Sequence, residues 1–195
     1  MIDESLLQRT LGAALRSGGD FAEVFVEDRR SSSAHLDDGR VEELTSGRDR
    51  GAGIRVIDGA TTGYAHPADL SEAGLRAAAE AASAAARKRD GGINVVALTR
   101  QATRRPNDVA VLPETVAKAT KVELLKRADE AARSMGSSVV QVSAGYSDGR
   151  RRVLVANSEG LLAEDDQVKT ALRVNVVAQR LVACLLYTSD AADEL

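Results

Sequence analysis

GRDRGAGIRVIDGATTGYA, residues 47–65, forms a glycine-rich stretch in the first half of the chain. Its five glycines suggest a phosphate-binding loop at first sight. A dinucleotide fingerprint would need glycine where Val56 stands, and a Walker loop would need a glycine followed by lysine and a hydroxyl residue. Instead, apolar and polar residues alternate on both sides of the turn signal Asp58-Gly59. The stretch therefore predicts two strands and a tight turn. We expect Gly51, Gly53 and Gly63 to serve the hairpin turns, at least one with positive φ, and to bind no nucleotide.

The flanking residues extend this hairpin into a meander with a helix on each side. Residues 21–36 alternate as a strand that ends at an Asp-Asp-Gly turn, and further strands are predicted over 41–45, 52–57 and 61–66. Apolar residues at helical spacing predict a helix over about 3–17. Asp69, followed three residues later by Glu72, predicts the capped start of an alanine-rich helix.

The second half repeats this order. Thr120 and Glu123 form a capping box before a helix that Gly136 ends, and alternating strands follow around turns at Asp148-Gly149 and 158–160. The fold class is therefore α+β, with antiparallel β meanders and flanking helices, and a helix-then-meander unit that occurs twice. We predict an N-terminal lobe over 1–89, a linker or crossover over 90–119, a second lobe over 120–180 and a non-native tail over 181–195.

Composition limits the possible partners and compartment. The 195 residues are 44% hydrophobic but only 3% aromatic, without tryptophan, and carry a net charge of −3. These values favour an aliphatic core and argue against binding to nucleic acid or to anionic membranes. The one cysteine, Cys184, excludes an internal disulfide. No apolar run approaches the roughly 20 residues of a membrane span, so we expect a cytoplasmic protein.

Catalytic constellations are scarce. Zinc hydrolases commonly place two histidines one helical turn apart, whereas His35 and His66 stand alone on predicted strands. Cys184 lacks a partner histidine, and the serines at 31–33 lack a nucleophile elbow. By residue types alone, this is a non-catalytic protein. Three residues near the predicted hairpins are candidates for contacts with a substrate, with a purely structural role as the alternative: Arg48, Arg55 and Tyr64.

Two long stretches carry a resemblance to a known family. AEVFVEDRRSSSAHLDDGRVEELTSGRDRGAGIRVIDGATTGYAHPADLSEAGLRAA (22–78) and RVLVANSEGLLAEDDQVKTALRVNVVA (152–178) resemble the N-terminal region of TldD/PmbA metallopeptidases, which are also named for modulation of DNA gyrase. The pairing of RGAGIRVI with TGYA is closer to the TldD branch.

The resemblance implies a zinc peptidase whose metal ligands lie elsewhere. In this family a His-Glu-x-x-x-His helix and a distant cysteine hold zinc, in the part that follows the N-terminal region, and nothing here matches those ligands. The final LVACLLYTSDAADEL (181–195) resembles translated adaptor sequence, with a genuine divergent end as the alternative, so Cys184 is not expected to be the metal cysteine. We expect this chain alone to bind no zinc and to cleave no peptide.

By the same resemblance, the intact protein would cleave peptides or unfolded protein segments with zinc-activated water. The N-terminal region, which this chain resembles, would supply subunit contacts and one wall of the peptide channel. The assembly would be a homodimer or a heterodimer with a PmbA-like paralogue. The alternative is a non-enzymatic binding or regulatory protein of the gyrase-modulator type.

Overall fold

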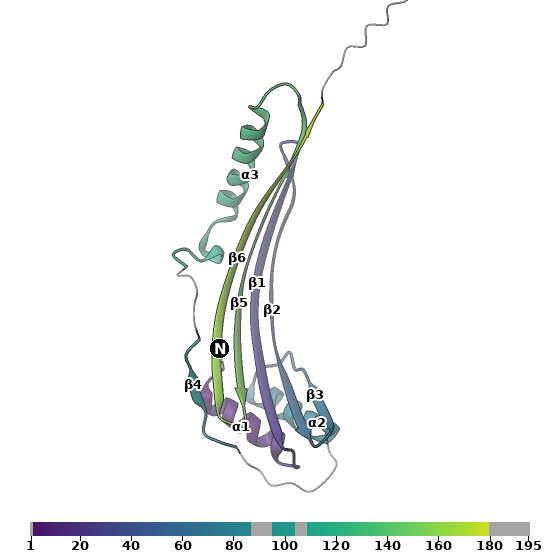
Figure 1. Ribbon diagram of the computed structural model, residues 1–195, viewed down its shortest axis with the longest axis vertical. Helices are drawn as coiled ribbons and strands as arrows, with labels where there is room; N and C mark the ends of the chain where they lie inside the picture. The colour runs from purple at the N-terminus through teal and green to yellow at the C-terminus, as the bar shows by residue number, and fades with distance from the viewer. Residues whose placement is uncertain (1, 87–94, 104–108, 180–195) are drawn as a thin grey trace, which may run out of the picture.

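The computed structural model describes residues 2–86, 95–103 and 109–179, and its main feature is one long, curved sheet (Figure 1). Its four long strands are β1 (Phe21–Asp37), β2 (Arg40–Asp58), β5 (Val139–Asn157) and β6 (Leu161–Ala178). The short strands β3 (Thr61–Ala65) and β4 (Thr99–Gln101) complete a six-stranded sheet in the order β3-β2-β1-β5-β6-β4. All neighbours are antiparallel except β4 and β6, which confirms the predicted α+β class.

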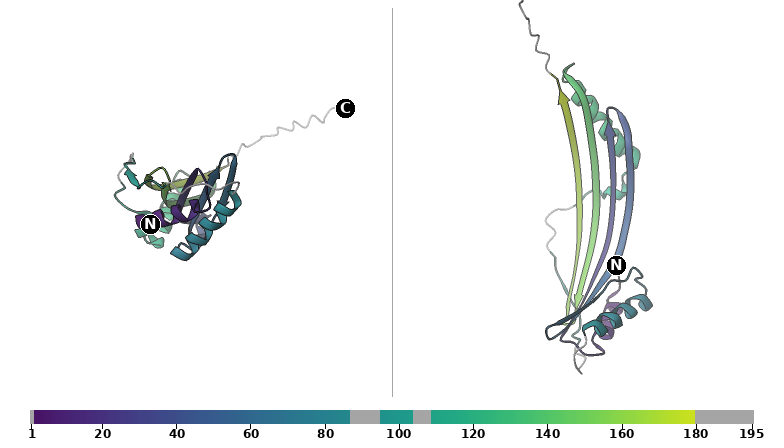
Figure 2. Two further views of the ribbon diagram at one scale, coloured as in Figure 1. Left: turned by 90° about the horizontal axis from the view of Figure 1, so that it is seen from below. Right: turned by 90° about the vertical axis from the view of Figure 1, so that its right-hand side faces the viewer.

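The helices cover only the two ends of the sheet. Helices α1 (Glu4–Leu15) and α2 (Glu72–Ala86) pack at one end, and α3 (Lys118–Arg133) lies along the other, as Figure 2 shows from two further sides. A short 3-10 helix, η1 (Pro113–Thr115), precedes α3. No helix within the described residues is long and apolar enough to cross a membrane.

The helix starts differ in part from the sequence predictions. Asp3 caps α1, since its side chain accepts a hydrogen bond from the Leu6 N–H at 3.0 Å. At α2 the Ser71 hydroxyl accepts from Gly74 N–H, while Asp69 binds Ser71 instead of capping the helix directly. Helix α3 begins at Lys118 after an Ala117 that makes no side-chain cap, so the capping box predicted at Thr120 was wrong.

Two predicted turns are absent because strands run through them. Strand β2 continues past Gly47, Gly51 and Gly53, and β5 continues past Asp148-Gly149. Strand β1 lies between β2 and β5 and pairs with both over nearly its whole length, so ladder hydrogen bonds outweigh the local turn tendency. The chain turns at Asp38-Gly39, at Gly59 and at Gly160, where φ is positive.

The two predicted lobes share this one sheet. Strand β1 pairs with β5 from Glu23 opposite Asn157 to Asp37 opposite Ser143. The predicted linker contributes β4 and η1, and its residues 90–94 and 104–108 lie outside the described residues. The predicted tail over 181–195, with Cys184, also lies outside them, whereas the strand expected before it is β6.

Two separate apolar clusters lie on the same face of the sheet, which we name the helix face. The larger cluster joins α1 and α2 to the strands, with Leu7, Leu11 and Val24 fully buried. The smaller one joins Leu125 of α3 to Leu36 and Ala144. Within the described residues, these two clusters leave the middle of the sheet without an apolar cover.

Candidate functional site

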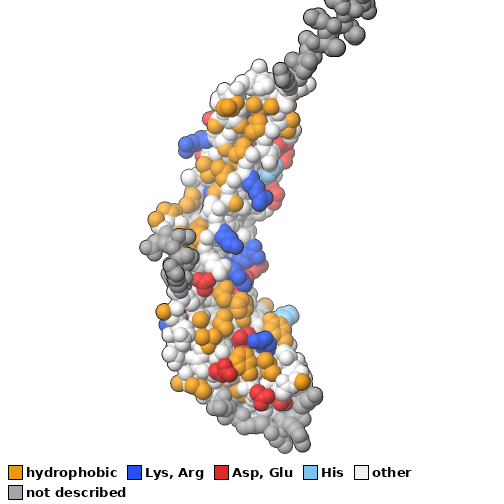
Figure 3. Space-filling view, in the orientation of Figure 1, with side chains coloured by type: hydrophobic (Ala, Val, Ile, Leu, Met, Phe, Trp, Pro, Cys, Tyr) orange, Lys and Arg blue, Asp and Glu red, His pale blue; other side chains and the backbone are white. Residues whose placement is uncertain are grey.

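The middle of the long sheet is polar on both faces. On the helix face of β1, buried Val24 and Val26 are followed at two-residue steps by Asp28, Arg30 and Ser32, before Ala34 and Leu36 are buried again. Figure 3 shows the same division over one side of the surface, with Lys and Arg side chains at mid-height and hydrophobic side chains toward both ends. Since aliphatic residues build the core, this polar band marks the part of the sheet most suited to binding.

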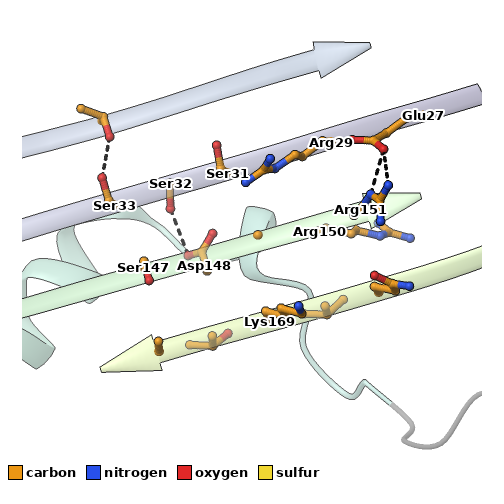
Figure 4. A pocket seen from close by; sticks show the side chains of 16 residues that line it. Glu27, Arg29, Ser31, Ser32, Ser33, Ser147, Asp148, Arg150, Arg151 and Lys169 are labelled. Atoms are coloured by element: carbon orange, nitrogen blue, oxygen red, sulfur yellow. Dashed lines mark hydrogen bonds and ion pairs between the residues drawn. The ribbon is translucent and has the colours of Figure 1, made fainter. Parts of the chain in front are cut away.

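On the opposite, helix-free face the band forms a trough of about 940 Å³ (Figure 4). Its floor consists of small residues that the strand register brings side by side. Ser31 lies opposite both Gly47 and Gly149, and Ser33 lies opposite Ser147. Ser33 and Thr45 share a hydrogen bond of 2.6 Å. The hydroxyl groups can donate to or accept from a bound chain.

Charged side chains border this floor. Arg151 donates from Nε and Nη2 to the same Glu27 oxygen, at 2.8 and 2.6 Å. The side chains of Arg29 and Lys169 are exposed and make no hydrogen bond or ion pair within the described residues. Arg29 stands between Asp49 and Arg151 in the register, so the charge around the trough is mixed. The arrangement offers hydrogen-bond donors and acceptors beside charged groups of both signs, which suits the binding of a polar chain.

On the helix face the polar band is a dense ion-pair network that attaches α3 to the sheet. Lys121 Nζ lies 2.5 Å from Asp148 Oδ2 and 2.8 Å from Ser32 Oγ, and Ser32 in turn donates to Asp148. The Lys121 and Asp148 side chains are only 6% and 5% exposed. Burial and the neighbouring Asp148 raise the pKa of Tyr146 to about 12. These groups are fully engaged with one another, which is typical of a structural role.

Arg150 extends the network to η1 and β6. Its guanidinium binds Asp166 through Nε and Nη2 at 2.8 and 2.6 Å, and Glu114 through Nη1 at 2.7 Å. The hydrogen bonds to Asp166, and to a smaller extent the bond to Glu114, raise the pKa of Arg150 above its usual value. Arg150 thereby fixes the segment before α3 against the sheet.

The three residues predicted to contact a substrate do not converge. Arg48 lies on the helix face and binds Asp28 at 3.0 and 2.6 Å, which lowers the pKa of that carboxyl. Arg55 lies on the other face, 3.3 Å from Glu23, and stands opposite Tyr64 of β3. Tyr64 is 59% exposed. Arg55 and Tyr64 are therefore neighbours at one end of the sheet, beyond the residues that line the trough.

The glycines predicted to form turns lie inside strands instead, and none of the three has positive φ. Gly63 lies against α2, where a Cβ would overlap the Ala82 carbonyl oxygen. Gly53 lies beneath the Tyr64 ring, where a Cβ would overlap the hydroxyl. A Cβ on Gly51 would meet only the Pro67 carbonyl, at 3.6 Å. Close packing against the α2 backbone, not turn geometry, requires glycine at 63, whereas at 53 the added Cβ would meet only the exposed Tyr64 ring, which can move aside.

The two histidines are far from forming a metal centre. His35 Nδ1 lies 3.7 Å from Glu42, and the His66 ring lies 6.1 Å from that of Tyr64. Among the described residues no group of three or more His, Cys, Asp or Glu side chains is placed to hold an ion. These residues do not fit the zinc site that the family resemblance implies.

Comparisons with known proteins identify the family. Residues 22–86 match the PmbA/TldA metallopeptidase domain 1, and residues 112–190 match the PmbA/TldA metallopeptidase central domain. The chain belongs to the PmbA/TldD metallopeptidase family. It is 29% identical over 161 residues to the metalloprotease TldD homolog of Haemophilus influenzae, and 32% identical over 163 residues to a metalloprotease of Methanothermobacter thermautotrophicus. Each alignment covers 82% of this chain but only 33% and 34% of the relative, so the chain spans about a third of their length.

Solved structures show the same fold at low sequence identity. A Thermotoga maritima protein named for modulation of a DNA gyrase superposes with a TM-score of 0.75 at 19% identity, covering 90% of this chain and 40% of that one. TldE from Thermococcus kodakarensis superposes with a TM-score of 0.67 at 18% identity, covering 90% of this chain and 40% of that one. The long sheet with helices at its two ends is thus a fold shared with these proteins.

Proposed function

We propose that this chain is the non-catalytic N-terminal portion of a TldD/PmbA-type metallopeptidase, and that the trough on its helix-free face holds an extended segment of the peptide substrate. The trough is the observation that carries the proposal. It combines a floor of serine and glycine with Arg29 and Lys169 at its border, whose side chains make no ion pair in the part of the chain that the structure describes. A binding surface of this kind can orient a chain without contributing to bond cleavage.

The dimensions of the trough suit an extended peptide. Its lining on β1 runs from Glu27 to Ser33, which at the rise of a strand corresponds to about 20 Å, or roughly six residues of an extended chain. Hydroxyl groups of Ser31 and Ser147 and the amide of Gln167 can hydrogen-bond peptide groups whatever the side chains are. Broad acceptance of sequences is what cleavage of unfolded segments requires.

Exposed strand edges offer a second mode of peptide contact. Strand β3 pairs only with Ile54–Asp58, and the described chain places no strand beside the outer edge of β2 from residue 40 to 51. A peptide can add to such an edge through main-chain hydrogen bonds. We assign the main contact to the trough, because its side chains supply groups that an edge alone does not.

The chemistry of cleavage is assigned to other residues of the intact enzyme. Among the described residues no group of His, Cys, Asp or Glu side chains fits a zinc ion. We further propose that the intact protein works in the cytoplasm on peptides or unfolded protein, as a homodimer or with a PmbA-like paralogue, and without nucleic acid.

Peptide binding to the purified chain tests the proposal. The probe is a fluorescein-labelled, unstructured peptide of ten neutral residues, followed by fluorescence polarisation. Ser147→Leu fills the floor of the trough, and Asn175→Leu is the matched control, because Asn175 lies on the same face of β6 but outside the trough. We expect saturable binding that Ser147→Leu weakens at least tenfold and Asn175→Leu leaves unchanged. Equal affinities for both variants would contradict it.

The alternative is a non-enzymatic regulatory protein of the gyrase-modulator type, favoured by the absence of a metal cluster from the described residues. It predicts binding to folded gyrase with no preference for unfolded peptides. A pull-down that retains purified gyrase, combined with no peptide binding, would favour this alternative.

A further inference from the structure

Three arginines stand side by side on the helix face of the sheet. Arg30 of β1 lies directly opposite Arg48 of β2 and directly opposite Arg150 of β5. All three share the face of Ser32, on which α3 packs. Like charges directly opposite one another destabilise a sheet, so this arginine row needs neutralisation.

Among the described residues, carboxylates bind only the two outer members of the row. Arg48 binds Asp28, and Arg150 binds Glu114 and Asp166. The Arg30 side chain makes no hydrogen bond or ion pair within the described residues, although its charge acts on Asp28 and Glu114. The central guanidinium of the row is therefore free to bind an external anion.

The surroundings of Arg30 add further positive charge. Asp28 stands between Arg50 and Arg152 in the adjacent row, and Lys118 and Lys121 approach from α3. The cluster thus holds three more cations than carboxylates, on a chain whose net charge is −3. Its cations are Arg30, Arg48, Arg50, Lys118, Lys121, Arg150 and Arg152, and its carboxylates are Asp28, Glu114, Asp148 and Asp166.

A cleft gives a ligand access to this charge. The cleft has a volume of about 550 Å³ and lies between the sheet and the segment from η1 to the start of α3. A smaller hollow of about 90 Å³ adjoins it, lined by Asp28, Glu114 and Arg152 among others, and Arg30 lines both. Ser46, whose hydroxyl accepts from Lys118 Nζ at 3.1 Å, and Ser32 supply neutral groups.

We propose that this cleft is a binding site for a phosphate-class oxyanion, with Arg30 as its principal ligand. Guanidinium groups form charge-assisted, forked hydrogen bonds to such oxygens. Cations that approach from three strands and from α3 suit a multiply charged, tetrahedral ion better than a flat carboxylate. The arginine row lies on the opposite face of the sheet from the peptide trough, and the two hollows share the lining residues Ser31, Ser32, Asp148 and Arg150.

Calorimetric titration of the whole chain tests this site. The probes are inorganic phosphate, pyrophosphate and a phosphoserine peptide, each at an ionic strength held constant with sodium chloride. We expect saturable binding of phosphate, and Arg30→Gln should weaken it at least about tenfold through loss of a charge-assisted contact. Arg173→Gln removes the same charge from the opposite face of β6 and should leave the affinity unchanged.

Stability without ligand separates lost binding from lost folding. Because Arg30→Gln relieves repulsion within the row, it should melt at the same temperature as the parent or higher when phosphate is absent. Tighter binding of the phosphoserine peptide than of free phosphate would identify a phosphate group on a protein as the ligand. Tighter binding of free phosphate would identify the free ion as the ligand.

Three results would overturn the site. The first is that no phosphate probe shows saturable binding. The second is that Arg30→Gln and Arg173→Gln lose phosphate affinity equally. The third is that single-stranded DNA binds more tightly than the phosphate probes and still does so in Arg30→Gln.

Discussion

Lys121 of α3 and Asp148 of β5 form a buried ion pair, with Nζ and Oδ2 2.5 Å apart and both side chains less than a tenth exposed. Strand β5 passes straight through Asp148-Gly149, so this carboxylate points from the middle of the sheet toward α3. The small apolar cluster beneath α3 has five buried residues, and the ion pair adds a second point of attachment.

We expect Lys121→Met to destabilise the protein by about 3–5 kcal/mol, because it leaves Asp148 buried and without its cation. Lys126→Met is the control, since Lys126 pairs with Glu123 on the exposed side of α3 and its loss should cost less than about 1 kcal/mol. Urea unfolding of both variants measures the difference. Similar midpoints would show that the buried pair does not hold α3.

The close contact between Gly63 and α2 makes a second prediction. A Cβ at this position meets the backbone of α2 at Ala82 and Ala86, which cannot move as a flexible side chain can. Gly63→Ala should therefore cost about 1–3 kcal/mol through overpacking. Gly12→Ala, within α1 and with no atom in its way, should instead stabilise by about 0.5–1 kcal/mol. Thermal unfolding of the two variants should shift in opposite directions, and a shift in the same direction would refute the packing account.

Tyr146 makes a prediction about alkaline pH. Its pKa is raised from the model-compound value of 10.0 to about 12 in the folded protein. The folded state then holds the phenol proton more tightly than the unfolded state, so the stabilisation is complete below pH 10 and is lost as the pH rises toward 12. The loss should reach about 2–3 kcal/mol. Tyr146→Phe should remove this part of the slope between pH 10 and 12, and an unchanged slope would refute the shift.

Local sequence signals predicted the three α-helices and the positions of the long strands, but not the length of those strands, and neither β4 nor η1 was predicted. Helical spacing located the α-helices, and Asp-Gly or glycine located the turns at 38–39, 58–59 and 158–160. The glycines of residues 47–53 and the Asp148-Gly149 pair indicated turns that do not form. Pairing of β1 on both sides overrides them, and on the β5 side it joins residues more than 100 positions apart.

The candidate site was less predictable for the same reason. Ser31 and Ser33 drew attention only as possible nucleophiles, whereas their place in the trough depends on the register that brings Ser147 and Gly149 beside them. Arg48 was singled out without a sign that Arg30 and Arg150 would flank the same row. The alternation of polar residues within three long strands is the signal that could have indicated a polar mid-sheet band.

The location of a bound peptide is the most direct test of the proposed function. A ten-residue neutral peptide with a photoreactive benzophenone side chain at its centre would be irradiated with the whole chain, and the attachment sites identified by mass spectrometry. We predict attachment to the trough strands, within residues 27–33 of β1, 147–151 of β5 and 167–171 of β6, and its loss in Ser147→Leu. Attachment confined to the helix face, or attachment that Ser147→Leu leaves unchanged, would contradict the account.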